Sequence, residues 1–330
     1  MPDSNAGVRL IDTVPGRIPI TKILFLGRWD WANLCNRIAR AINTAVGIEC
    51  ARVATENAHP FGYVEDLILK RDGVDGAVEI AKTVDWIITT GDGEYDFFQR
   101  MLSELPLPKD VRIGVTHAGS AYREDARRMN RRDAELGAKV RFVGSDSLIL
   151  AKGDPRAVPY FGTSDIAPVL TRIDGVPIVS HSPSSRATKG SEKILQVLRR
   201  LESEGLYSVD LIEGVSAEEA SCRRGSAHVH IDQMNPDVGG FGQSAIEAMG
   251  VGCAVLCDIR KVVSDVWRFF PPPPIIDVRK STDLEEWLRS LAANPELLHR
   301  YRAAAYAWSA ANSSPDAVAR YWLYHLDRAL

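Results

Sequence analysis

One glycine-rich turn that runs directly into a helical pattern constrains this chain most. It spans residues 239–250 and reads GGFGQSAIEAMG, with apolar runs on both sides at residues 227–231 and 254–257. Glycines free the backbone for a tight turn whose N–H groups can face an anion, and the helix N-terminus behind it adds about half a positive charge. The order strand, loop, helix, strand is that of a nucleotide site in an α/β sheet. Glu247 lies far enough into the helix to reach a sugar hydroxyl of the same ligand.

The rest of the chain alternates apolar runs with helical patterns at short intervals, which is typical of parallel sheets covered by helices. Strands are expected at residues 20–26, 49–53, 85–90, 111–116, 177–181, 209–213, 227–231 and 254–257. Helices are expected at residues 31–46, 64–69, 75–82, 95–104, 121–136, 190–204 and 216–224, and the last segment, 295–330, is helical with a break at 312–315.

The pattern restarts after a polar stretch at residues 162–175, so two domains are expected. The predicted fold is α/β, with two Rossmann-like doubly wound domains that face a cleft. The N-terminal domain spans residues 1–168 and the C-terminal domain 169–312, while residues 313–330 form a helix that packs back on the first domain. In such sheets, ligands bind at the carboxyl ends of the strands, where the polar loops of this sequence fall.

Composition excludes several classes of protein. The net charge of −3 argues against a surface that coats nucleic acid. No apolar run approaches the roughly 20 residues that cross a bilayer, and the N-terminus lacks the pattern of a signal peptide. The five cysteines show no zinc-ligand spacing, so they are expected to be reduced thiols. The sequence therefore predicts a cytoplasmic protein with no transmembrane segment and no metal site.

The C-terminal half resembles the GT-B glycosyltransferases, in particular the retaining, nucleotide-sugar-dependent group around family 4. Three segments carry the resemblance: residues 181–190 (HSPSSRATKG), 214–219 (GVSAEE) and 240–249. Together they cover the region from about residue 175 to 262. The N-terminal half is similar in layout, and also at residues 117–120 (HAGS) and Arg123.

The resemblance implies transfer of a sugar, with retention, from a UDP- or GDP-linked donor that is a co-substrate, without a further cofactor. Lys189 would bind the diphosphate, residues 214–216 the base and Glu247 the ribose, while His117 would lie near the transferred sugar across the cleft. The catalytic residues it implies are His117, Arg186, Lys189 and Glu247. The donor-binding residues it implies are Gly27, Ser184, Lys189, Gly214, Val215, Gly240, Phe241, Gly242, Gln243, Ser244 and Glu247.

The sequence departs from the family at two positions. Many members carry two glutamates spaced E-x7-E, but Gly239 stands where the first is expected, and nearby Asp237 could replace it. The usual arginine five residues before the lysine is Ser184 here, so Arg186 could supply that charge. We expect a metal-independent mechanism, in which lysine, arginine and helix-end amides stabilise the leaving diphosphate.

The acceptor is expected on the N-terminal domain, with Asp30, Asn33, Asp92 and Arg123 as candidate ligands. Asp30 and Asn33 could instead cap a helix, and Asp92 could serve its own turn. Trp29 and Trp31 flank Asp30 and could pack in the core or form an aromatic shelf for a sugar. The acceptor class stays open between a small molecule, a glycan, a lipid-linked molecule and a nucleic acid.

Two other functions fit the same fold. A nucleotide-sugar epimerase shares the architecture but needs further carboxylates in the cleft. A catalytically degenerate protein that binds a nucleotide sugar as a sensor or scaffold is suggested by the glycine at position 239.

Overall fold

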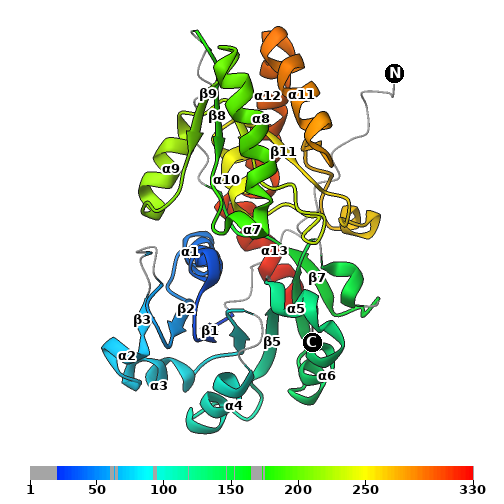
Figure 1. Ribbon diagram of the computed structural model, residues 1–330. Coiled ribbons are helices and arrows are strands. Elements are labelled where there is room, and N and C mark those ends of the chain that lie inside the picture. The colour runs from blue at the N-terminus through cyan, green and yellow to red at the C-terminus, as the bar shows by residue number, and fades with distance from the viewer. Residues whose placement is uncertain are drawn as a thin grey trace.

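The computed structural model describes residues 21–59, 63, 66–91, 95–117, 119–145, 147–151, 153–164, 173 and 175–329. The described residues form two α/β halves, each built on a fully parallel sheet (Figure 1). The predicted fold class is confirmed. The predicted division at 168/169 falls among residues outside the described part, so that boundary stays a prediction.

The first sheet has the strand order β3-β2-β1-β4-β5-β6-β7. All strands are parallel, but the order in which the chain adds them changes direction between β1 and β4. Its strands are β1 (Ile23–Gly27), β2 (Ala51–Thr55), β3 (Leu67–Ile68), β4 (Trp86–Thr89), β5 (Arg112–His117), β6 (Val140–Gly144) and β7 (Ala157–Tyr160). Its helices are η1 (Trp31–Asn33), α1 (Leu34–Val46), α2 (Leu69–Asp72), α3 (Asp75–Ala81), α4 (Tyr95–Glu104), α5 (Ser120–Glu124), α6 (Ala126–Glu135) and η2 (Leu148–Ala151).

Side chains that alternate along β1 build two cores, one on each face of the first sheet. Ile23 and Phe25 pack with α1, while Leu24 and Leu26 pack with α3 and α4. A strand points successive side chains to opposite faces, so a strand buried on both faces reads as a continuous apolar run.

The second sheet has the order β12-β11-β10-β8-β9, with its reversal between β8 and β10. Its strands are β8 (Ile178–His181), β9 (Ser208–Leu211), β10 (Val229–Ile231), β11 (Ala254–Cys257) and β12 (Ile276–Asp277). Its helices are α7 (Arg186–Lys189), α8 (Ser191–Ser203), α9 (Ala217–Gly225), α10 (Gln243–Gly250), η3 (Ser264–Arg268), α11 (Ser281–Ala293) and α12 (Pro295–Asn312). Helices α8 and α11 cover one face, and α10 and α12 cover the other.

The last helix, α13 (Pro315–Arg328), leaves the second half and packs on the first (Figure 1). Trp322 of α13 is fully buried, and its ring stacks on Phe142 of β6 with 3.7 Å between centroids. The chain passes between the halves twice, after Ser164 and after α12, and these two segments meet at a buried cluster of three serines. The Ser164 hydroxyl lies 2.8 Å from the hydroxyls of both Ser309 and Ser313.

Three expectations for the secondary structure were wrong. Residues 67–68 form strand β3 rather than a helix; residues 64–65 lie outside the described part. The helix expected at 121–136 divides at Asp125, whose carboxylate accepts the Arg128 N–H at 3.1 Å and caps α6. The helix expected from residue 31 begins as a 3-10 turn, with Ala32 and Asn33 in the left-handed region.

None of the helices in the described part of the chain combines the length and the apolar character that crossing a bilayer requires.

Candidate functional site

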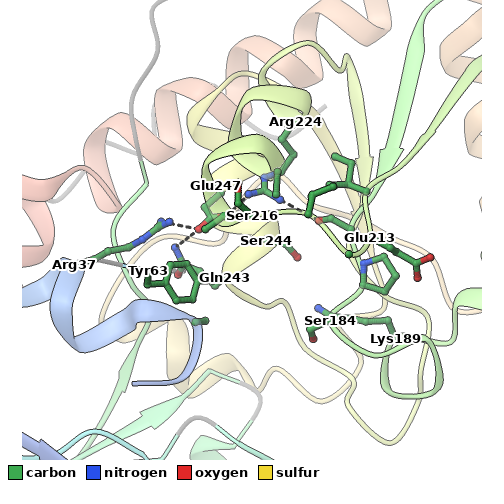
Figure 2. Close-up of a pocket in the computed structure, with 18 residues that line it drawn as sticks. Arg37, Tyr63, Ser184, Lys189, Glu213, Ser216, Arg224, Gln243, Ser244 and Glu247 are labelled. Carbon is green, nitrogen blue, oxygen red and sulfur yellow. Dashed lines mark hydrogen bonds and ion pairs between the residues drawn. The ribbon is translucent and has the colours of Figure 1, made fainter. Parts of the chain in front are cut away.

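A cavity of about 220 Å³ lies at the carboxyl ends of the second sheet, beside the point where its strand order reverses. Ligands of open α/β sheets bind at such a reversal. The cavity wall includes loops that follow β8 and β9 and the first turns of α10, and the first half contributes Ala32, Arg37 and Tyr63 (Figure 2). The expected site residues in its lining are Ser184, Lys189, Gly214, Val215, Gln243, Ser244 and Glu247.

Beneath the cavity, the Asp232 carboxylate accepts hydrogen bonds from Lys189, Ser244 and Gly242, and from the Cys257 thiol at 3.6 Å. It lies 2.5 Å from Lys189 Nζ and accepts the Ser244 hydroxyl at 2.6 Å and the Gly242 N–H at 2.7 Å. The carboxylate is fully buried. Burial opposes its ionisation, but Lys189, the Ser244 hydroxyl and the Gly242 N–H outweigh burial, so the pKa of Asp232 is held below its usual range.

A side chain at residue 242 would crowd this arrangement. A Cβ on Gly242 would lie 3.1 Å from Lys189 Nζ. The glycine therefore lets the lysine approach the N-terminus of α10. At the start of α10 the Gly242 N–H is given to Asp232 and the Ala245 N–H bonds to the Gly242 carbonyl at 3.1 Å, while Gln243 and Ser244 line the cavity beside Lys189.

Glu247 is held between two arginines from different halves of the molecule (Figure 2). Arg37 Nη1 of α1 lies 2.6 Å from Glu247 Oε1, and Arg224 of α9 pairs with Oε2. Gln243 donates to Glu247 Oε1 at 3.4 Å and to the Thr163 carbonyl at 2.8 Å. Burial raises the pKa of the Tyr63 hydroxyl beside them, and the charge of Glu247 raises it further.

The loop after β9 supplies backbone to the cavity and caps the next helix. Gly214 and Val215 line the wall, and the Ser216 hydroxyl accepts the Glu219 N–H at 3.2 Å. Arg186 points elsewhere: it makes a two-fold contact with Glu213, at 2.9 and 2.7 Å, and is absent from the cavity lining.

The position that carries a glutamate in the resembled family is closed here by a lysine side chain. Gly239 has a φ of +58°, and a Cβ there would lie 2.6 Å from Lys261 Cγ. Asp237 is exposed and does not line the cavity; its backbone carbonyl accepts the Lys261 ammonium. A glutamate at residue 239 would therefore be strained and would clash.

His117 is buried inside the first half and does not line the cavity. Its Nε2 lies 3.0 Å from Asp133 Oδ2, and its ring stacks on Tyr122 at 4.1 Å between centroids. Asp133 also accepts the Tyr95 hydroxyl at 2.6 Å and pairs with Arg141. The structure thus places this histidine in a buried polar network.

The candidate acceptor residues are placed as follows. The Asp30 carboxylate caps α1, because it accepts the N–H groups of Cys35 and Asn36 at 2.9 and 2.8 Å. Asn33 is buried, and its Oδ1 has no hydrogen-bond partner among the described residues. Arg123 lies on α5, away from the cavity lining, and Asp92 lies outside the described residues.

Four expected donor residues do not line the cavity: Gly242, described above, and Gly27, Gly240 and Phe241. Gly27 ends β1 and accepts the Glu56 N–H at 2.9 Å. The Gly240 carbonyl accepts Gln233 Nε2 at 3.0 Å, and Phe241 packs in the core beside α10.

Four residues of the site escaped the sequence analysis: Arg37, Tyr63, Arg224 and Asp232. Both arginines lie in amphipathic helices where they read as solvated charges, and Tyr63 carries no local signal. Asp232 did carry a sequence signal, because a carboxylate directly after a buried parallel strand lies at the sheet edge where ligands bind.

The described residues contain no group of three or more side chains that could hold a metal ion.

Two parallel sheets whose carboxyl ends face one shared cavity, with the last helix returning to the first half, define the architecture. The chain has the GT-B fold. Models of known protein families do not match the sequence, and neither does any curated protein.

Solved structures agree on the GT-B fold. HepE from Anabaena, solved with UDP-glucose, superposes with a TM-score of 0.63 at 11% identity, over 94% of this chain and 100% of that one. An alpha-glucosyltransferase solved with UDP-glucose and DNA gives 0.62 at 10% identity, over 89% and 95%. A sucrose-phosphate synthase from Thermosynechococcus elongatus gives 0.59 at 15% identity, over 93% and 98%.

Proposed function

We propose that this GT-B protein is a glycosyltransferase that moves a sugar from a nucleotide-sugar donor to an acceptor hydroxyl. One observation carries the proposal: Lys189, the α10 N-terminus, Ser244 and Glu247 converge on one cavity at the strand-order reversal of the second sheet. Cationic and N–H donors suit a diphosphate, and a carboxylate suits a ribose diol.

In this proposal the donor lies along the cavity with its parts on different loops. Lys189 and the first turn of α10 bind the diphosphate, and Glu247 accepts from the ribose hydroxyls. The backbone of residues 214–216 holds the base. A UDP- or GDP-linked donor is the co-substrate, and the structural neighbours solved with UDP-glucose support the UDP form.

Transfer breaks the bond between the anomeric carbon and the diphosphate oxygen, and the electron pair stays on the diphosphate. The acceptor oxygen then bonds to that carbon, and its proton passes to the leaving diphosphate oxygen. We propose that Lys189 and Arg224 stabilise the leaving diphosphate without a metal, because both line the cavity. Arg224 would have to turn from Glu247 for this, as Arg186 would have to leave Glu213 to take part. Retention is proposed on the resemblance to family 4.

A thermal-shift screen tests the donor site, with UDP, GDP, ADP and TDP and their sugars, each with and without EDTA. A ligand at 100 times its dissociation constant stabilises the fold by about 2.7 kcal/mol, which shifts Tm visibly. One selective shift that EDTA does not change is the expected result. No shift in any series would overturn the donor assignment.

Lys189→Ala tests the phosphate role directly. We expect donor affinity to fall by about 2–3 kcal/mol, the scale of a charge-assisted hydrogen bond. Lys193→Ala is the matched control, since Lys193 is an exposed lysine on the adjacent helix α8. Equal donor binding by the two variants would show that Lys189 does not hold the diphosphate.

A further inference from the structure

Four aromatic side chains form a row on the first half, beside the cavity. Trp29 and Trp31 lie 6.1 Å apart between ring centroids, His59 lies 5.9 Å from Trp31, and Tyr63 lies 4.8 Å from His59. Tyr63 is itself part of the cavity wall (Figure 2), as is Ala32, the residue after Trp31. The aromatic row therefore begins at the proposed donor site and leads away from it.

Trp31 presents a large aromatic surface to solvent. It is 52% exposed, whereas most large apolar side chains in the described part of the chain are buried. Its indole rests on the loop after β4, because a Cβ on Gly91 would lie only 3.1 Å from Trp31 Cδ1. A single exposed aromatic residue is not evidence of a binding site. The backbone conformation of the turn that carries Trp31 is a second, independent observation.

The turn that presents Trp31 is strained. Ala32 and Asn33 both have a φ of 56°, a left-handed conformation that side chains other than glycine adopt rarely. The same turn leaves Asn33 Oδ1 buried without a hydrogen-bond partner among the described residues. Strain and an unsatisfied acceptor together indicate a turn arranged for binding rather than for its own stability.

The position of the row matches that of a second substrate. Trp29 and Trp31 follow β1, His59 follows β2, and Gly91 follows β4, so the row lies at the strand-order reversal of the first sheet. That edge adjoins the cavity of the second sheet, since Tyr63 belongs to both the row and the cavity wall, and Ala32, the residue after Trp31, also lines the cavity.

We infer that Trp31 and its aromatic neighbours form the acceptor subsite, and that the acceptor presents a pyranose ring there. This inference rests on the proposed transferase function. The face of an indole carries partial negative charge, which attracts the C–H groups on one face of a sugar ring. The Asn57 amide lies near the row, because it donates to the carbonyl of Arg28, the residue before Trp29, at 3.3 Å.

The surroundings favour a sugar over a lipid chain or a nucleic acid. The other exposed large apolar residues of the described chain are Ile48, Val74 and Val176, which stand singly after α1, between α2 and α3, and before β8. A lipid chain would need a continuous apolar surface. Arg28 lies 3.7 Å from Glu56, and Lys70 Nζ lies 2.7 Å from Asn57, so cations near the row have polar or acidic partners. A nucleic-acid strand would need cations aligned along its backbone.

The test measures binding of three fluorescently tagged trisaccharides, made of glucose, N-acetylglucosamine or galactose, by anisotropy. We compare the wild type with Trp31→Ala, Trp31→Phe and Trp31→Leu. Val176→Ala is the control, because Val176 is 51% exposed on the other half. We expect the wild type to bind at least one trisaccharide, with affinity about tenfold weaker in the Ala and Leu variants. The Phe variant keeps an aromatic face and should lose less, and the control should match the wild type.

Binding of UDP, measured by thermal shift on the same variants, separates this inference from the proposed function. Unchanged UDP binding with lost saccharide binding supports the subsite. The inference is overturned if the wild type binds no saccharide, or if Trp31→Ala binds saccharide as tightly as the wild type, regardless of the result for UDP binding. A dT20 oligonucleotide or phosphatidylglycerol vesicles that bind through Trp31 in place of the sugars would overturn it as well.

Discussion

Asp232 is the residue on which the cavity floor depends. A fully buried carboxylate is costly unless it is paired, and here a lysine, a hydroxyl and a backbone N–H satisfy it. The Lys189 ammonium keeps two further protons that can face a phosphate, whereas the Ser244 hydroxyl and the Gly242 N–H have given their single protons to Asp232. Asp232 therefore fixes the position of Lys189 before any ligand arrives, which lowers the cost of ordering it on binding.

A double-mutant cycle on Asp232 and Lys189 measures this coupling. Asp232→Asn should lower the free energy of unfolding by about 3 kcal/mol, because it leaves a largely buried ammonium without its partner. Lys189→Met alone should also destabilise, while the double variant should cost less than the sum, as read from urea denaturation. Exposed Asp237→Asn is the control and should change stability by less than about 0.5 kcal/mol. Additive effects of the two substitutions would refute the coupling.

Sequence patterns predicted which residues line the cavity better than they predicted which side chains pair with one another. Lys189, Ser244 and Glu247 line the cavity as expected, because the loops that carry them follow adjacent parallel strands. The pairing of Arg186 with Glu213 and of His117 with Asp133 could not be predicted, since the partners lie 27 and 16 residues away. Whether each lining residue binds the donor stays a prediction.

At the scale of elements, the start of α1 combines strain with strong capping. Ala32 and Asn33 each cost about 1–2 kcal/mol in their left-handed conformation. The buried Asp30 carboxylate offsets part of that cost, since it accepts two N–H groups of the first turn. The cap thus supports the turn that presents Trp31.

Asp30→Ala removes this support. We expect the free energy of unfolding to fall by about 2 kcal/mol, at the upper end for a lost cap because the site is buried. Thermal or urea unfolding measures the loss. Asp125→Ala, which removes the exposed cap of α6, should cost about 1 kcal/mol and serves as the comparison. An Asp30 variant as stable as the wild type would mean that the strained turn needs no cap.

The length of an element did not by itself decide whether it was predicted. The helix at residues 95–104 and the strand at 254–257 were confirmed residue for residue. Strand β3 has only two residues and lies at a sheet edge, so its apolar pattern is too short to distinguish from a helix. Strands β7 and β12 and helix α11 were not expected, and the first two have only four and two residues.

At the scale of the whole molecule, the halves meet through the proposed ribose-binding residue. Arg37 reaches from α1 to Glu247, and Gln243 of α10 bonds to the crossing segment at Gly162 and Thr163. A ligand at Glu247 would therefore touch both halves, so donor binding and closure of the cavity are expected to be linked.

Arg37→Gln tests that link. Without the ion pair the halves should separate more easily, so we expect a larger radius of gyration in small-angle scattering and weaker donor binding. Arg40→Gln is the control, since Arg40 is exposed on the same helix. The link would be rejected if the Arg37 variant kept the wild-type radius and affinity.

The return of α13 to the first half gives the molecule a predictable response to acid. His325 lies in α13 with its ring 4.6 Å from Tyr321 and 5.8 Å from Phe269, and burial lowers its pKa to about 4. The folded state therefore favours the neutral imidazole, and the unfolded chain binds the proton more readily. Stability from this group is fully present above the unfolded pKa near 6.5 and is lost as the pH falls from about 6.5 to about 4.

We expect this group to contribute about 2 kcal/mol of the loss of unfolding free energy over that range. His325→Phe removes the titrating ring but keeps an aromatic side chain, so its stability should fall less steeply between pH 6.5 and 4. Urea denaturation at several pH values measures both slopes. His299→Phe is the control, because His299 is exposed on α12. Equal slopes for the His325 variant and the wild type would show that His325 does not carry the acid response; a reduced slope would show that it carries part of it.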